Sequence, residues 1–229
     1  MLTDPAQPLV DHPRVAGLLL AAGAGQRYGQ PKALVDSGSG SWVQRGVQAL
    51  AACDPIVVVL GARSVEVAAL VPTGVRIVVN PDFADGMGSS LRVGLTALVN
   101  GALANETEPA RSIPSAGELP LGRPPAGVTL ERPIDAALVM LVDLPGIGQA
   151  VINRVLAAVG SSSEARSCLA RAAYDGVPGH PVLLGFDHWS EVKARAVGDR
   201  GARDYLRSRR VTLIECGDIG SGEDVDRPG

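Results

Sequence analysis

The chain has 229 residues, of which 46% are apolar and 20% are charged, so its composition fits one large folded domain and excludes a wholly disordered chain. The formal net charge of −3 argues against nucleic acid as the main partner, although a few well-placed cations can still bind a phosphate group. Three widely spaced cysteines, Cys53, Cys168 and Cys216, fit neither a disulfide framework nor a zinc site, and we expect inert thiols.

The first residues indicate where the folded part begins. Residues 1–13 are acidic and contain proline, which predicts a flexible tail rather than a signal peptide. The longest apolar run, residues 15–22, is far too short to span a membrane. We therefore expect a cytoplasmic protein without a membrane partner, whose single domain covers residues 14–229.

The first two thirds of that domain alternate between apolar runs and amphipathic stretches. The apolar runs predict buried strands at 14–20, 55–60, 75–79 and 136–142. The amphipathic stretches predict helices at 41–52, with Ser41 as N-cap, at 65–71 and at 87–99. Strands that are apolar on both faces and alternate with helices are typical of a parallel sheet covered on both sides. We predict an α/β fold of the doubly wound kind, with a mostly parallel sheet in three layers.

Residues 100–134 interrupt this pattern. The segment carries six prolines and four glycines in 35 residues and has almost no apolar periodicity. A loop of that length without secondary structure is usually disordered or functional, and we predict a disordered insertion. After it, strands are expected at 168–174, 181–184 and 211–215, with helices at 189–196 and 202–209.

The loop after the first strand carries the clearest chemistry. Gly23, Gly25 and Gly29 follow the strand directly, where the backbone of a glycine-rich turn can point its N–H groups at a phosphate. Arg27 and Lys32 add two cations suited to a triphosphate. The dinucleotide fingerprint fails because position 28 is tyrosine, and the Walker A loop fails because Lys32 lies between proline and alanine.

Four further residues are candidates for a functional role. Asp143 ends an apolar strand at the edge where the glycine loop lies, so it is suited to hold Mg²⁺ beside substrate phosphates or to cap the next helix. Ser89 and Ser90 begin a helix, where hydroxyls either contact a base or ribose or cap the helix. His180 precedes a strand between Gly179 and Pro181, facing a second substrate or simply filling the core.

Six segments in chain order resemble the MobA-like nucleotidyltransferases. The loop from Leu20 to Lys32 resembles their signature. The remaining segments resemble the molybdopterin cytidylyltransferase branch, and they lie at residues 86–94, 142–145, 179–185, 198–203 and 224–228.

The resemblance implies transfer of a nucleoside monophosphate, with CTP as the favoured donor and molybdopterin or the molybdenum cofactor as acceptor. It implies Lys32 and Arg27 as catalytic residues, Asp143 and Asp226 as Mg²⁺ ligands, and His180 and Arg200 as acceptor contacts. The nucleotide-binding residues that it implies are Leu20, Ala21, Ala22, Gly23, Gly25, Ser89 and Ser90.

Other functions stay open at this point. The same loop serves transferases that act on sugar or polyol phosphates. A non-catalytic chaperone that binds nucleotide or cofactor and hands the cofactor to a molybdoenzyme is a second alternative. A dinucleotide-dependent oxidoreductase is disfavoured, because the fingerprint fails at Tyr28 and no acidic residue follows the second strand.

Overall fold

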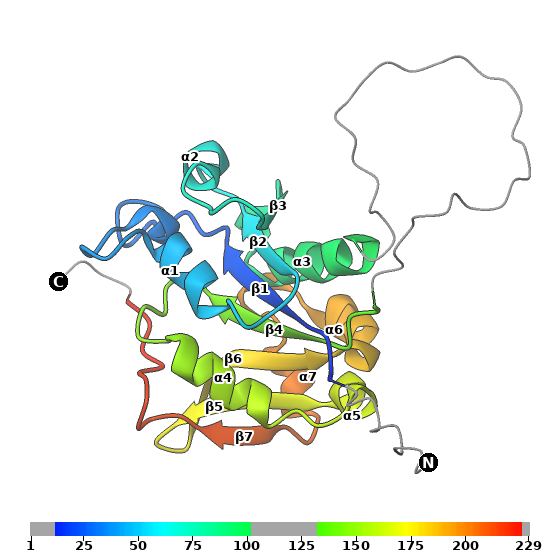
Figure 1. Ribbon diagram of the computed structural model, residues 1–229. Helices are drawn as coiled ribbons and strands as arrows, with labels where there is room; N and C mark the ends of the chain where they lie inside the picture. Colours follow the sequence, from blue (N-terminus) through cyan, green and yellow to red (C-terminus); the bar gives the residue numbers. More distant parts are fainter. Residues whose placement is uncertain (1–11, 102–131, 226–229) are drawn as a thin grey trace, which may run out of the picture.

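The computed structural model describes residues 12–101 and 132–225, which form a seven-stranded sheet between two layers of helices (Figure 1). The flexible tail predicted for residues 1–13 and the disordered insertion predicted for residues 100–134 fall almost entirely outside the described residues.

The sheet confirms the predicted α/β class. Its strand order is β3-β2-β1-β4-β6-β5-β7, and all neighbouring pairs are parallel except those made by β6. The strands are β1 (Val15–Ala21), β2 (Ile56–Leu60), β3 (Arg76–Val79), β4 (Ala136–Leu141), β5 (Leu169–Tyr174), β6 (Val177–Gly185) and β7 (Thr212–Glu215). Every residue of β1 is buried, as the continuous apolar run predicts for a strand covered on both faces.

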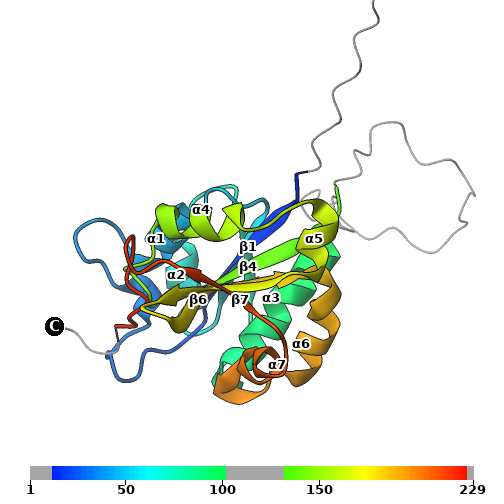
Figure 2. The same cartoon turned by 90° about the horizontal axis from the view of Figure 1, so that it is seen from below.

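The helices divide into two layers that enclose two separate cores (Figure 2). One face is covered by α1 (Trp42–Ala49), α2 (Ser64–Ala68) and α4 (Gln149–Ala157). The other is covered by α3 (Met87–Gly101), α6 (Trp189–Arg195) and α7 (Arg203–Arg207). The short helix α5 (Ser162–Ser167) precedes β5, and single 3-10 turns lie at Lys32–Leu34, Phe83–Asp85, Phe186–His188 and Gly198–Arg200.

The predicted elements lie within a few residues of the observed ones, with two exceptions. Ser41 is the N-cap of α1 and forms a capping box with Gln44, as expected. The helices α4 and α5 were not predicted, although Val151, Ile152 and Val155 of α4 are buried at helical spacing. The strand β6 begins four residues earlier than predicted, because the turn at 175–176 folds β5 and β6 into a hairpin.

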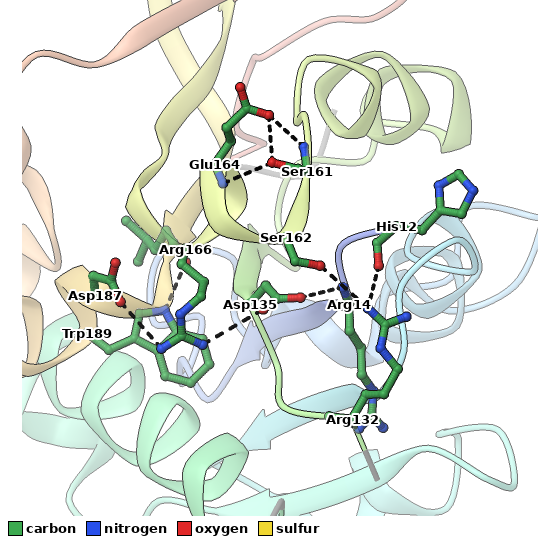
Figure 3. Close-up of polar contacts among 11 residues, drawn as sticks. His12, Arg14, Arg132, Asp135, Ser161, Ser162, Glu164, Arg166, Asp187 and Trp189 are labelled. Carbon is green, nitrogen blue, oxygen red and sulfur yellow. Dashed lines mark hydrogen bonds and ion pairs between the residues drawn. The ribbon is translucent and has the colours of Figure 1, made fainter. Parts of the chain in front are cut away.

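Charged residues close the sheet at the amino ends of β1 and β4 (Figure 3). The carboxylate of Asp135, directly before β4, is buried and accepts the backbone N–H of Arg14 at 2.9 Å. Arg166 of α5 lies 3.8 Å from Asp135 and 3.4 Å from Asp187, so it joins β4 to the turn after β6. Arg132 donates to the backbone oxygen of His12 at 2.8 Å. These contacts satisfy the buried charge and fix the start of both central strands.

The remaining expectations concern cysteine and membranes. All three cysteines are free, and burial raises the pKa of Cys53 to about 12 and raises those of Cys168 and Cys216. Thiols of this kind stay protonated and are poor nucleophiles, which agrees with the expected inert role. Within residues 12–101 and 132–225, the structure holds no helix of the length and apolar character needed to cross a membrane.

Candidate functional site

A cleft of about 480 Å³ opens at the carboxyl ends of β1 and β4. Its walls come from four segments far apart in the sequence: the glycine loop after β1, the turn between β3 and α3, the end of β4, and Asp199 in the turn before α7. Of the predicted site residues, those that line it are Leu20, Ala22, Gly23, Gly25, Arg27, Lys32, Ser90 and Asp143. Ala21 is buried in β1 behind this lining. The carboxyl edge of a parallel sheet is where such folds bind their ligands.

The glycine loop is a tight turn that only glycine permits at its centre. Gly25 has φ +61°, and a Cβ added there would lie 1.8 Å from the backbone oxygen of Gln30. The carbonyl of Gly25 accepts the N–H groups of Tyr28 and Gly29, both at 2.9 Å. The turn therefore brings the chain back on itself and delivers Lys32, in the 3-10 turn that follows, to the cleft.

Lys32 and Asp143 meet inside the cleft. The Lys32 Nζ lies 3.0 Å from Asp143 Oδ2, and the two side chains are 13% and 24% exposed. The pair joins the loop after β1 to the loop after β4, across 111 positions of sequence. Arg27 lines the same cleft. The lining also holds a second carboxylate, that of Asp199, so the cleft is not cationic as a whole, but its two cations can bind the oxygens of a phosphate chain.

Asp143 has the chemistry of a magnesium ligand. Its carboxylate faces the cleft, and the following helix α4 begins after Gly148, so Asp143 does not cap that helix. Mg²⁺ is usually held by one or two carboxylates together with substrate phosphates, so the carboxylate of Asp143 is of the kind that fits this ion. The described residues hold no group of three or more metal-ligating side chains.

The C-terminal segment returns to the same place. Val225, the last described residue, donates its N–H to the backbone oxygen of Asp143 at 3.1 Å, and Ser221 donates to Gly146 at 3.4 Å. A Cβ on Gly146 would lie 2.8 Å from the Ser221 oxygen, so the two segments are in close contact. The predicted second ligand, Asp226, lies outside the described residues.

The two serines differ in their surroundings. Asn80, buried at the end of β3, donates to Ser89 Oγ at 2.9 Å and to Ser90 Oγ at 3.0 Å. The Ser89 hydroxyl lies 2.8 Å from the backbone oxygens of both Asp82 and Gly86, so it holds the turn before α3 and does not line the cleft. Ser90 does line it. Asn80 was missed, although a polar residue directly after a buried strand and before Pro81 signals a structured turn.

The segment 196–200 also reaches the cleft. Gly86 has φ +96°, and a Cβ there would lie 2.6 Å from Asp199 Oδ1, so the turn before α3 packs directly on this segment. Asp199 lines the cleft. The predicted acceptor residue Arg200 is exposed, lies outside the cleft lining and pairs with Asp204 at 3.2 Å. Of two adjacent charged residues, the structure thus turns the aspartate and not the arginine toward the cavity.

His180 lies beside the cleft rather than in its lining. It belongs to β6, which pairs antiparallel with β4 through Val139 and Val182, so its neighbours at the strand start lie next to the end of β4. Its backbone oxygen accepts the Tyr174 hydroxyl at 2.7 Å. Burial, then the charges of Arg171 and Arg203, lower the pKa of His180 to about 4. The imidazole is therefore neutral at physiological pH.

Comparisons with known proteins agree with this geometry. The sequence profile of the MobA-like NTP transferase domain matches residues 17–213. The chain is 33% identical over 231 residues to the nicotine blue oxidoreductase of Paenarthrobacter nicotinovorans, covering 94% of both chains.

Solved structures show the same fold. The Rv0371c protein of Mycobacterium tuberculosis H37Rv, in complex with manganese, is 22% identical with a TM-score of 0.61, covering 93% of this chain and 94% of the other. The molybdopterin-guanine dinucleotide biosynthesis protein A of Archaeoglobus fulgidus is 14% identical with a TM-score of 0.53, covering 87% and 83%.

Proposed function

Because the chain belongs to the MobA-like NTP transferase family, we propose that it transfers a nucleoside monophosphate from a nucleoside triphosphate to a phosphorylated acceptor and releases pyrophosphate. CTP is the favoured donor, and molybdopterin or the molybdenum cofactor is the favoured acceptor. The observation that carries the proposal is the Lys32–Asp143 pair, 3.0 Å apart in a cleft whose wall is a glycine turn.

The triphosphate is assigned to the glycine turn and its cations. Backbone N–H groups at Gly23 and Gly25, with the side chains of Lys32 and Arg27, supply donors and positive charge for its oxygens. The base and ribose are assigned to the apolar side of the cleft at Leu20 and Ala22, with Ala21 behind them in β1 and Ser90 at the start of α3. Ser89 supports this contact indirectly by holding the turn.

Asp143, together with Asp226, would hold Mg²⁺. When bound, the ion neutralises charge on the triphosphate and orients it. Lys32 then has two tasks in turn: it keeps the Asp143 carboxylate in place before the substrate binds, and it donates to phosphate oxygens afterwards. Its side chain is only 13% exposed, so the charge acts in a site with little water, where it is worth more than in bulk solvent.

The chemical step needs positioning rather than a protein acid or base. An oxygen of the acceptor phosphate forms a bond to the α-phosphorus, the bond from the α-phosphorus to the bridging oxygen breaks, and pyrophosphate leaves with that oxygen and its electron pair. Negative charge grows on the leaving pyrophosphate, beside Lys32 and Arg27. His180 and Arg200 are assigned to the acceptor side.

A second candidate is an oxidoreductase that uses a reduced nicotinamide dinucleotide. The observation in its favour is the 33% identity to a protein named nicotine blue oxidoreductase. A dinucleotide could occupy the same cleft, but its hydride transfer would have no use for a metal on Asp143.

One assay separates the candidates. The full chain is incubated with Mg²⁺ and each of CTP, GTP, ATP and UTP, against molybdopterin and a sugar or polyol phosphate, and pyrophosphate is measured. In parallel, NADPH oxidation is followed with nicotine blue as electron acceptor. We expect pyrophosphate with CTP and molybdopterin that stops when EDTA is added. NADPH oxidation that survives EDTA, without pyrophosphate from any pair, would overturn the proposal in favour of the oxidoreductase.

The outcomes within the transferase class also differ. Pyrophosphate with a sugar or polyol phosphate alone would keep the nucleotidyl transfer and replace the acceptor. Tight CTP binding without pyrophosphate and without NADPH oxidation would contradict catalysis and favour a chaperone that hands cofactor to a molybdoenzyme.

A further inference from the structure

Two arginines and a histidine meet on the face of the sheet that α6 and α7 cover. Arg171 lies on β5, and its Nε donates to the backbone oxygen of Gly179 at 2.9 Å, which fixes the guanidinium beside the start of β6. Residue 169 on the same side of β5 belongs to the core shared with Trp189 and Tyr205. Arg203 begins α7, and its charge reaches both Arg171 and His180.

The positive charge of this cluster is not balanced within the described part of the chain. Neither Arg171 nor Arg203 makes an ion pair there. The nearest carboxylate along α7, that of Asp204, lies 3.2 Å from Arg200 and 3.9 Å from Arg207. Burial, followed by the charge of Arg203, lowers the pKa of Arg171. A half-buried guanidinium group that a second guanidinium group repels is costly to the fold unless an anion joins the two.

The cluster borders the cleft. The start of β6 lies beside the end of β4, where Leu141 and Asp143 line the cavity. Asp199, four residues before Arg203, lines the same cavity. Gly201, between them, packs on the lining residue Met87, since a Cβ added to Gly201 would lie 3.2 Å from Met87 Sδ. The cluster is therefore adjacent to the cleft lining, both across the sheet and along the chain.

We propose that Arg171, Arg203 and the neutral imidazole of His180 form an anion subsite for the phosphomonoester of the second substrate. Guanidinium groups bind such dianions through paired, charge-assisted hydrogen bonds, and a neutral imidazole adds one N–H donor without adding charge. The inference rests on the proposed function, because the second substrate is the acceptor of the nucleotidyl group. It adds Arg171 and Arg203 to the residues assigned to the acceptor.

The first test uses inorganic phosphate as the probe and needs no catalysis. Phosphate is titrated into the full chain while the NMR signals of the His180 ring, identified by their loss in His180→Gln, are followed. We expect saturable shifts in the wild type and a dissociation constant about tenfold to a hundredfold higher in Arg171→Gln and in Arg203→Gln. Arg207→Gln, on the same helix and paired with Asp204, is the matched control and should leave the constant unchanged.

Two results would overturn the subsite. One is the absence of any phosphate-dependent shift of the His180 ring. The other is an affinity that follows Lys32→Ala but not the arginine variants, because phosphate would then bind at the glycine loop. Arg203 is exposed, so Arg203→Gln keeps the test valid even if Arg171→Gln fails to fold.

A second arm separates this inference from the proposed function. Where the enzyme releases pyrophosphate, Arg203→Gln should raise the KM for the phosphorylated acceptor by about tenfold and leave the KM for the triphosphate unchanged. Equal KM values for the acceptor would overturn the subsite while the transferase stands. Phosphate binding at the cluster without any pyrophosphate release would support the subsite and contradict the transferase.

Discussion

The strand β4 has an aspartate near each end, and the two aspartates differ in their exposure and in their partners. The side chain of Asp135 at the amino end is 8% exposed and accepts a backbone N–H, and its ion-pair partner Arg166 in turn reaches Asp187 (Figure 3). Asp143 at the carboxyl end is 24% exposed, pairs with Lys32 and faces a cavity.

The difference lies in what surrounds each carboxylate. At the amino end the partners are backbone groups and neighbouring side chains, so every charge is used to close the fold. At the carboxyl end, Lys32, Arg27 and Asp143 line open space, and Arg171 and Arg203 have no carboxylate partner among the described residues. A charge that faces a cavity is available to a ligand, whereas a charge that is fully paired stabilises the protein.

The largest effect should follow from removing the cation of the carboxyl end. Lys32→Ala should lower the rate of pyrophosphate release by at least about a hundredfold, since it removes charge stabilisation from the leaving pyrophosphate. The midpoint of urea unfolding should change less than the rate, because Asp143, the partner that stays behind, lines an open cleft. A variant that unfolds easily but keeps its rate per folded molecule would make Lys32 structural, like Arg166.

The glycine turn offers a matched pair of substitutions. Gly25→Ala should weaken triphosphate binding by at least about tenfold, because it adds strain at φ +61° and places Cβ 1.8 Å from the Gln30 oxygen. Gly29→Ala is the control, with a similar φ of +86° but nothing within 4 Å of the added atom. Titration calorimetry with CTP checks both. Equal losses in the two variants would mean that backbone strain alone, and not the closure of the turn, sets the affinity.

At the amino end the effect should be on stability. Asp135→Asn leaves a buried amide in place of a paired carboxylate, so we expect the free energy of unfolding to fall by about 1–3 kcal/mol in urea titrations. Pyrophosphate release per folded molecule should stay within a factor of about two. A loss of activity larger than the loss of folded protein would contradict the division between the two ends of β4.

The last effect concerns pH. The pKa of His180 is about 4 in the folded protein, below its ordinary 6.5, because burial and two arginines disfavour its charged form. Between these two pH values the unfolded chain binds the proton and the folded chain does not, so His180 makes stability fall as the pH falls from 6.5 to 4. Urea unfolding of His180→Gln across that range should show a shallower decline than the wild type. Parallel curves would mean that the histidine titrates normally in the folded state.

The sequence predicted those elements whose residue pattern has a single local cause. The apolar runs predicted β1, β2 and β4, because strands covered on both faces need apolar residues throughout. The glycine loop with Lys32 was found in the same way, since the turn at Gly25 tolerates no other residue.

The features that the sequence did not predict depend on contacts between segments that are far apart in the chain. The choice of Asp199 over Arg200 is made by the packing of residue 86 on the segment 196–200, which no local pattern reveals. The role of Asp135 depends on Arg14, which lies 121 positions before it, and on Arg166 of helix α5. The helix α4 is a different case. Its buried Val151, Ile152 and Val155 do carry a helical signal, so the local pattern was sufficient to predict this helix.

The central claim is that the cleft at the carboxyl end of β4 is a nucleotidyl-transfer site organised by Asp143, while the aspartate at the other end serves the fold. It is tested most directly by measuring pyrophosphate release with Mg²⁺, CTP and molybdopterin for Asp143→Asn and Asp135→Asn side by side, per folded molecule. The account predicts a loss of about a hundredfold or more for Asp143→Asn and nearly full activity for Asp135→Asn. Full activity in Asp143→Asn, or equal losses in both variants, would contradict it.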